Sequence, residues 1–160
     1  MAGSEALSER ERRLLEELLV RKLRFMLVGM SAALIQGVRG STEDIDLWFE
    51  DATDPRIGEA VRAVGGVWIS GSFGMTPPRI GGDALGDRFD VVTHMSGLGR
   101  FSDEVAHVRT AVVDGLELPV LSLERILVSK KAAARPKDLL AAHLIEDTLA
   151  ILDDEKSTDR

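Results

Sequence analysis

The alternation of apolar and polar positions along the first third of the chain predicts helix, strand, helix and strand in turn. A capping-box sequence, S-x-x-E, precedes leucines at helical spacing and predicts a helix over residues 8–22. An unbroken apolar run at 25–28 predicts a buried strand, and the short apolar segment at 31–36 predicts the start of a second helix. Alternating apolar residues over 44–49 predict a second strand with one face on the core.

The rest of the chain continues this alternation, punctuated by proline and glycine. Asp-Pro precedes one helical pattern and Gly-Gly ends it, Asp-Gly lies between two apolar runs as in a hairpin, and a proline separates the last two helical patterns. The predicted elements are a helix over 54–64, strands over 67–70 and 88–95, a hairpin over 108–121, a helix from Ser122, a final helix over 139–152 and a frayed polar tail over 153–160. The pattern favours an α/β (α+β) fold in which helices flank a mixed β-sheet and further helices form the C-terminus.

Length and composition restrict the class of protein. A chain of 160 residues predicts a single domain, 1–160, with an N-terminal helix in 1–24, a sheet core in 25–121 and C-terminal helices in 122–152. The absence of cysteine excludes disulfides and thiolate chemistry, and a net charge of −7 argues against a general nucleic-acid binder. The chain shows no signal-peptide pattern and no apolar run of membrane-spanning length, so we expect a cytoplasmic protein.

Residues 71–87 are rich in glycine and proline and form a long connection between predicted strands. Long loops in compact domains are often functional, so we interpret this segment as a loop or irregular hairpin that borders an active site. A merely mobile connection is the alternative interpretation. The Gly71-Ser72-Phe73-Gly74 run at its start precedes no helix pattern, which argues against a phosphate cradle there.

Two carboxylates, Asp44 and Asp46, open the second predicted strand. Because side chains alternate along a strand, the two point to the same face and repel each other. Such an edge pair is often only solvated, but hard oxygen ligands held close together also suit Mg²⁺. The setting favours the metal, because the preceding strand ends at Gly29, where a backbone can approach a ligand, and a helix with exposed amide groups starts near Ser31.

This stretch resembles the signature of the DNA polymerase β-like nucleotidyltransferase superfamily, and is most similar to its small stand-alone bacterial members, some of which belong to toxin–antitoxin pairs. The residues that match the signature are Gly29, Ala32, Gly37, Thr42, Asp44, Ile45, Asp46 and Leu47. A second match lies near the C-terminus, in Lys130, Arg135, Lys137 and Asp138. The chain departs from the pattern at Met30, where the family has a second small residue, and at Gly40, since the usual arginine stands one place earlier as Arg39.

The resemblance implies metal-dependent nucleotidyl transfer, with Mg²⁺ or Mn²⁺ as cofactor and a nucleoside triphosphate as substrate. The implied catalytic residues and metal ligands are Asp44, Asp46 and a third acid on a neighbouring strand, Asp90. Asp90 would also take the proton of the acceptor hydroxyl, whereas a hydrogen-bonded carboxylate at a strand edge is the alternative. The residues implied to bind the nucleotide are Gly29, Ser31, Arg39, Thr42, Lys130 and Lys137. A cation cluster in an acidic chain attracts a polyanion such as a triphosphate, although a solvated helix junction has the same composition.

Three other functions fit the same sequence. A toxin–antitoxin component would act on a tRNA end or a partner protein and would bind an antitoxin partner. A non-catalytic relative would bind only a nucleotide or a partner, in keeping with Met30 and the shifted Arg39. A small-molecule modifier, such as an aminoglycoside nucleotidyltransferase, would favour a cationic acceptor. The three histidines lack metal-ligand spacing, and no Walker loop, nucleophile elbow or zinc motif is present.

Overall fold

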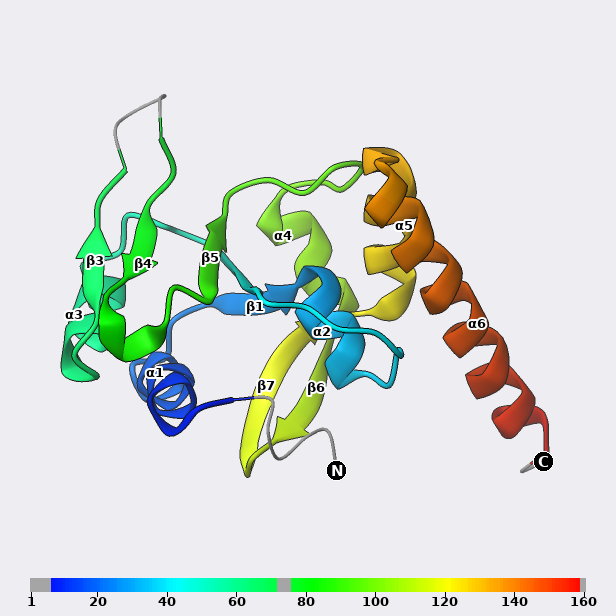
Figure 1. The fold of residues 1–160 in the computed structure, drawn as a ribbon, viewed down its shortest axis with the longest axis horizontal. Helices are drawn as coiled ribbons and strands as arrows, with labels where there is room; N and C mark the ends of the chain where they lie inside the picture. Colours follow the sequence, from blue (N-terminus) through cyan, green and yellow to red (C-terminus); the bar gives the residue numbers. More distant parts are fainter. Residues whose placement is uncertain (1–6, 72–75, 159–160) are drawn as a thin grey trace.

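A computed structural model describes residues 7–71 and 76–158 of the protein and shows a five-stranded sheet with helices around it (Figure 1). The helices are α1 (Glu9–Val20), α2 (Gly29–Ile35), α3 (Pro55–Ala63), α4 (Phe101–Glu104), α5 (Leu123–Ala133) and α6 (Pro136–Thr158). The strands are β1 (Phe25–Val28), β2 (Ile45–Phe49), β3 (Val67–Ile69), β4 (Arg79–Gly81), β5 (Phe89–Val92), β6 (Val108–Val113) and β7 (Leu116–Leu121), and the 3-10 turns are η2 (Asp83–Leu85) and η3 (Val105–His107). None of the described helices is long and apolar enough to cross a membrane.

The main sheet is mixed, with the strand order β5-β2-β1-β7-β6. β1 lies at its centre, antiparallel to β2 and parallel to β7, while β2 and β5 run parallel and β6 and β7 form an antiparallel hairpin. Every residue of β1 is buried, as expected for a central strand that is covered on both faces. The predicted mixed sheet, flanked by helices and followed by C-terminal helices, is confirmed.

The strand predicted at 67–70 forms, but it lies outside the main sheet. As β3 it pairs antiparallel with β4 in a separate two-stranded sheet, with Val67 opposite Gly81. Val67 and Ile69 are half exposed, and the segment packs on α3. β3 is short and buries little surface, so it would gain few contacts as a strand of the main sheet. The connection at 71–87 is therefore an irregular hairpin, although residues 72–75, which include most of the glycine-rich run at its start, lie outside the described residues.

α1 begins at a complete capping box. Ser8 Oγ accepts a hydrogen bond from Glu11 N–H (3.2 Å), and the Glu11 carboxylate accepts one from Ser8 N–H (2.8 Å). Glu11 is buried and forms an ion pair with Arg88, just before β5, at 2.9 Å. The fully buried leucines of the predicted helical stripe are Leu14, Leu15 and Leu18. The cap therefore starts the predicted helix and also ties it to the sheet.

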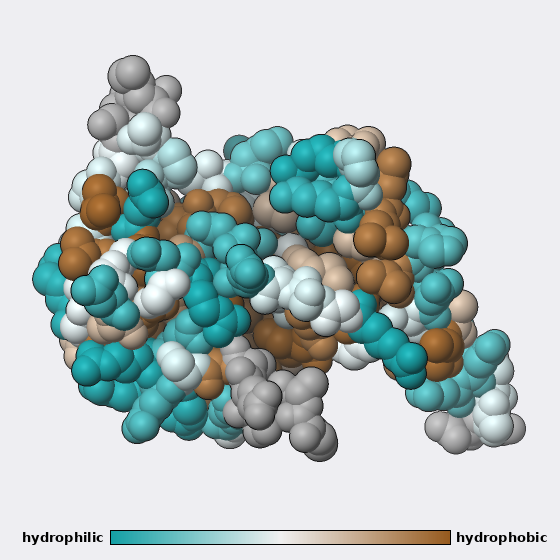
Figure 2. Space-filling model, in the orientation of Figure 1, coloured by the Kyte–Doolittle hydropathy of each residue, from teal (hydrophilic) through white to brown (hydrophobic). Residues whose placement is uncertain are grey.

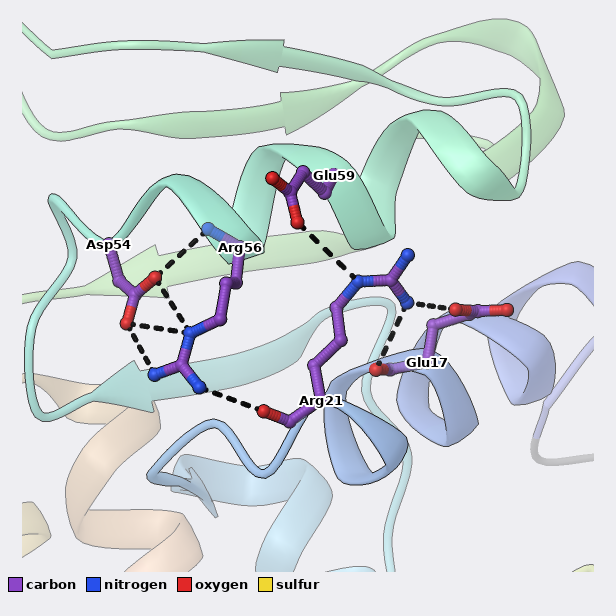
Figure 3. Close-up of polar contacts among 5 residues, drawn as sticks. All are labelled: Glu17, Arg21, Asp54, Arg56 and Glu59. Atoms are coloured by element: carbon purple, nitrogen blue, oxygen red, sulfur yellow. Dashed lines mark hydrogen bonds and ion pairs between the residues drawn. The ribbon is translucent and has the colours of Figure 1, made fainter.

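Two arginines connect the end of α1 to the start of α3 (Figure 3). Arg21, at the C-terminal cap of α1, forms ion pairs with Glu17 in the same helix and with Glu59 in α3, the latter at 4.0 Å. Arg56 binds the carboxylate of Asp54, the N-cap of α3, at 2.7 Å and donates a hydrogen bond to the Arg21 carbonyl oxygen at 2.9 Å. These contacts lie near the surface, so they orient α3 on α1 more than they stabilise the fold.

The two C-terminal helices meet where predicted, but the last one is longer. Ser122 caps α5, Ala134 ends it in the left-handed conformation (φ +56°), and Pro136 starts α6. The prediction that the chain frays from residue 153 is wrong, because α6 continues to Thr158. Residues 153–158 are polar but contain neither glycine nor proline, and polar residues alone do not end a helix.

Two further boundaries differ from the prediction. β5 covers only the central part of the strand predicted at 88–95, because the chain turns away after Val92 and passes through Gly97 in a left-handed conformation (φ +73°). No element was predicted between 96 and 107, where α4 and η3 form. Buried Glu104, at the end of α4, is bound by Arg125 of α5 at 2.7 Å, and this contact lowers the pKa of Glu104.

Candidate active site

Gly29 lies where β1 passes directly into α2, so the helix begins two residues earlier than predicted. The φ angle of Gly29 is +66°, in the left-handed region that favours glycine. A Cβ atom at this position would lie 2.2 Å from a carboxylate oxygen of Asp46 on β2, which is far inside van der Waals contact. Two features therefore require glycine at position 29: the left-handed backbone conformation and the close approach of the Asp46 carboxylate.

Ser31 fixes the strand that carries Asp46. Its side chain is buried, and its Oγ donates a hydrogen bond to the Val28 carbonyl oxygen (3.1 Å) and accepts one from Asp46 N–H (3.3 Å). The hydroxyl that was predicted to contact phosphate is thus engaged inside the protein. Ser31 links α2 and β1 to β2, a role that the sequence does not predict because Asp46 lies on a different element.

The three predicted acids gather at one edge of the sheet. Asp46 and Asp90 are register partners on the parallel strands β2 and β5. Paired residues on neighbouring strands are about 5 Å apart and point to the same face. Asp44 is exposed and lies one residue before β2, rather than within the strand as predicted. The non-local pairing of β2 with β5 is what brings Asp90 to the acid pair.

Burial and neighbouring negative charge raise the pKa values of Asp46 and Asp90. The pKa of Asp46 is raised from its ordinary 3.8 to about 6, first by burial and then by the negative charges of Asp90 and Asp44. Lys130 and Lys137 act on Asp46 in the opposite direction. The side chain of Asp90 is exposed at the surface, but the protein removes part of the water around its carboxylate, and this partial desolvation and then the charge of Asp44 raise the pKa of Asp90. The site therefore concentrates negative charge that a cation would balance.

The donor atoms of this site suit a hard divalent cation. In the part of the chain that the structure describes, no group of three Asp, Glu, His or Cys side chains is arranged to hold a metal ion. Mg²⁺ needs only one or two carboxylates, however, and completes its shell with water and substrate phosphate oxygens. The paired carboxylates of Asp46 and Asp90 fit an ion of this kind that arrives together with a nucleotide.

The predicted basic cluster is built around a buried carboxylate. Asp138, 1 % exposed in the first turn of α6, forms ion pairs with Lys130 Nζ of α5 at 3.4 Å and with Arg135 Nε at 2.5 Å. The hydrogen bond from Arg135, together with the charge of Lys130, holds the pKa of Asp138 below its ordinary value. Lys137 is exposed, and like Lys130 it lies within electrostatic reach of Asp46. Asp138 thus positions one of the two lysines that face the acids.

Replacing Asp138 with Asn should destabilise the protein by about 2 kcal/mol at neutral pH, because two cations lose their buried partner. The folded-state pKa of Asp138 is depressed, so its stabilisation is present above the unfolded-state pKa and is lost as pH falls through the folded-state value. Urea denaturation at neutral and at acidic pH should therefore show the difference shrinking in acid. Asp147→Asn, an exposed change in the same helix, is the control. A difference that stays constant with pH would contradict the ionic role of Asp138.

A cavity of about 320 Å³ opens beside the acids. It is bordered by Asp46 and Asp90 on the sheet and by Arg79 on β4, so the hairpin at 71–87 does border the acids. Arg79 partly offsets the rise in the pKa of Asp90 that burial causes. Sequence reasoning missed Arg79, although it is the only basic residue of that connection. A more open depression of about 410 Å³ lies elsewhere, at the start of α1.

Comparison with known proteins gives matches among structures only. No family model matches the chain, and no curated protein matches it. The solution structure of the antibiotic-resistance factor ANT(2'')-Ia, an aminoglycoside nucleotidyltransferase, matches with a TM-score of 0.64 at 16 % identity, over 99 % of this chain and 96 % of that one. The crystal structure of ANT(2'')-Ia in complex with adenylyl-2''-tobramycin matches with a TM-score of 0.59 at 19 % identity, over 90 % of each chain. The chain has a nucleotidyltransferase-like fold.

Within this nucleotidyltransferase-like fold, the side chain of Met30 lies beside Gly40. A Cβ atom at Gly40 would lie 3.0 Å from Met30 Cε, and Gly40 has a φ of +146°. A side chain at position 40 would therefore have to displace the end of the Met30 side chain. Arg39 is exposed next to this contact, and Thr42 Oγ1 accepts a hydrogen bond from Asp44 N–H at 3.2 Å. The turn at Thr42 thus leads the chain into the acid site.

Proposed function

We propose that the protein is a metal-dependent nucleotidyltransferase that moves a nucleoside monophosphate from a nucleoside triphosphate to a hydroxyl acceptor. The observation that carries this proposal is the register pairing of Asp46 with Asp90, directly against the glycine that starts α2 and within electrostatic reach of Lys130 and Lys137. The acids would bind the metal ion and the lysines would bind the phosphates, so the site suits a nucleoside triphosphate that carries a divalent cation.

Each residue has a distinct part in the proposed reaction. Asp46 and Asp90, with Asp44 beside them, would hold Mg²⁺ or Mn²⁺, and the bound ion would neutralise charge on the triphosphate and the leaving pyrophosphate. Lys130 and Lys137 would donate charge-assisted hydrogen bonds to phosphate oxygens. Asp90 is exposed and has a raised pKa, so it is suited to accept the proton of the acceptor hydroxyl.

Most of the remaining predicted residues would hold the acids in place rather than contact the substrate. Ser31 would keep Asp46 in place through the backbone hydrogen bond it accepts, and Gly29 would leave the Asp46 carboxylate its room. Thr42 would orient the turn that carries Asp44, and the exposed Arg39 would be available to a phosphate or to the base of the nucleotide. These assignments separate the groups that touch substrate from those that hold them.

Label transfer tests the proposal directly. The protein is incubated with each α-labelled nucleoside triphosphate, Mg²⁺ or Mn²⁺, and a mixture of total RNA, cell extract and small-molecule acceptors. We expect label on one acceptor class, and we expect Asp46→Asn to lower the rate by at least about a thousandfold, because a carboxylate ligand is lost. Asp153→Asn makes the same chemical change on the exposed end of α6 and should leave transfer unchanged. Equal transfer by the Asp46 variant would exclude the metal-binding role.

The cavity gives one indication of the acceptor. Among the described residues, the cavity is bordered by three carboxylates, Asp46, Asp87 and Asp90, and by one arginine, Arg79. This balance favours a small cationic acceptor, and ANT(2'')-Ia itself has been solved with adenylyl-2''-tobramycin. A tRNA end or a partner protein is the competing acceptor, and the label-transfer mixture separates the two. A neighbouring gene for a helical antitoxin partner would favour the toxin–antitoxin type.

A non-catalytic relative is the alternative outside enzyme chemistry. Calorimetry with a nucleoside triphosphate, with and without Mg²⁺, distinguishes it from the enzyme. The proposed site requires that affinity rise when the metal is added, because the metal bridges the acids and the phosphates. If the affinity for the nucleotide is the same with and without metal, and no label is transferred, the chain is a nucleotide-binding module.

A further inference from the structure

The end of α6 extends away from the rest of the protein. α6 is 23 residues long, and it packs through the buried residues Ala141, Ala142 and Ile145 in its first half. From Ala150 to Thr158 every residue is exposed, and this segment projects outward at the lower right of Figure 1. Helical segments this short are only marginally stable in water without tertiary contacts. A second surface that packs along α6 would therefore stabilise its outer part.

The outward face of α6 carries apolar side chains. Leu140 is 63 % exposed and Ile151 is 59 % exposed. Their separation of eleven residues is close to three helical turns, so they lie on one face. Exposed His143 and Asp147 lie between them on that face, at spacings of three and four residues. Figure 2 shows further apolar surface gathered over α5 and α6 on the side turned to the viewer.

Charge is distributed unevenly along the same helices. Residues 130–137 contain four bases and no acid, whereas residues 146–155 contain five acids and no base. The positive end of the helix dipole lies at the start of α6 and the negative end at its finish, so Lys137 in the first turn and the acids at 153–155 lie near the less favourable end, whereas Lys130 and Lys131 lie at the favourable end of α5. Among the described residues, no cation lies within ion-pair distance of the acids Asp147, Asp153, Asp154 and Glu155.

We propose that α6 is a dimerisation helix that packs antiparallel against α6 of a second copy of this chain. In that arrangement Leu140 lies against the partner's Ile151, and His143 lies opposite the partner's Asp147. The exposed bases at the start of each helix then lie near the acidic end of the other, where the acids gain an opposite charge. Lys130, Lys131 and Arg135 also keep their ion pairs within the chain. Each contact occurs twice about a two-fold axis, as in most homodimers.

A second copy is a better occupant than an unrelated helix because α6 carries both halves of the pattern. A foreign partner would have to supply a matching order of apolar and charged positions. A second α6 that runs in the opposite direction already has that order. The outward face is also opposite to the face that Ala141 and Ile145 bury, so pairing leaves the contact between α5 and α6 intact. The expected interface is small, which predicts a dissociation constant in the micromolar range.

Sedimentation velocity of the full chain, from low micromolar to several hundred micromolar, tests the dimer. We expect the mass to rise with concentration toward twice 17.4 kDa. Ile151→Lys should abolish the increase, because it places two cations in the apolar contact. Val112→Lys changes a side chain that is 70 % exposed on β6 and should leave the dimer unchanged. A wild-type protein that is monomeric throughout, or two lysine variants that behave alike, would overturn the proposal.

A charge exchange tests the antiparallel register. Asp147→Lys places a cation opposite the partner's His143, and His143→Glu places an acid opposite the partner's Asp147, so each variant alone should dimerise at least about tenfold more weakly. Mixing the two restores an opposite pair at both positions, so the mixture should form a heterodimer. If both variants dimerise like the wild type, or if mixing restores nothing, the antiparallel pairing of α6 is wrong.

Discussion

The Asp46→Asn variant should be more stable than the wild-type protein at neutral pH, by about 2–3 kcal/mol. Asp46 is ionised at neutral pH, although burial and the charges of Asp90 and Asp44 raise its folded-state pKa to about 6. An amide of the same shape has no charge to bury and no repulsion from its neighbours. The change that should remove the proposed activity is therefore expected to stabilise the fold, as is typical of residues that are retained for chemistry.

The pH dependence shows whether this gain comes from Asp46 itself. Because the folded-state pKa is raised, the stabilising contribution of the protonated carboxyl is fully present below the unfolded-state pKa and is lost as pH rises toward about 6. Denaturant unfolding of wild type and variant should coincide near about pH 4 and separate above about pH 6. Asp153→Asn should stay within about 0.5 kcal/mol of wild type at both values. A gain that is equally large in acid would show that the effect is not electrostatic.

Metal addition should reverse the order of the two proteins. A divalent ion at the proposed site would balance the charge of the Asp46 carboxylate, so its binding would stabilise the folded wild type by mass action. The Asn variant has lost that ligand and should respond less. Thermal unfolding with Mg²⁺ and a nucleoside triphosphate should therefore raise the Tm of the wild type and leave that of the variant nearly unchanged. A variant that gains as much as the wild type would place the ion elsewhere.

Much of the fold followed from local sequence signals. The four buried residues of β1, the capping box at Ser8 and the proline at 136 each fix an element through neighbours in sequence. The pairing of short strands is different, because it depends on distant partners. β3 joins β4 rather than the main sheet, and no property of its three residues determines that choice. The polar composition of residues 153–158 is typical of a frayed tail, but α6 continues through them, because polar residues extend a helix readily.

In the candidate site, too, some residues can be predicted from local sequence and others depend on tertiary structure. The spacing of Asp44 and Asp46 and the turn at Gly29 suffice to predict these three residues as site candidates, although Asp44 lies one residue before β2. Sequence spacing does not predict all of the residues that surround Asp46. The buried Ser31 hydroxyl bonds to Asp46 across two elements, and Arg79 reaches the cavity from a hairpin whose pairing was not predicted. Residues that hold or border the acids belong to tertiary structure, whereas the acids themselves carry a sequence signature.

Gly29→Ala should be the most damaging single change near the site, with a loss of about 3–4 kcal/mol of stability. The left-handed backbone (φ +66°) costs an L-residue about 1–2 kcal/mol, and the added Cβ would lie 2.2 Å from the Asp46 carboxylate. The carboxylate must then move, so metal-dependent nucleotide binding should be lost as well. Denaturant unfolding and calorimetry measure the two effects separately.

Gly86→Ala separates the two causes. Gly86 has nearly the same backbone conformation, φ +61°, but a Cβ there would meet nothing within 4 Å, so this variant should lose only the conformational term of about 1–2 kcal/mol. The excess at Gly29 should vanish when Asp46 is first replaced by Ala, because the clashing carboxylate is then gone. If Gly29→Ala costs the same with and without that carboxylate, then the close approach of Asp46 to the start of α2 does not explain the glycine.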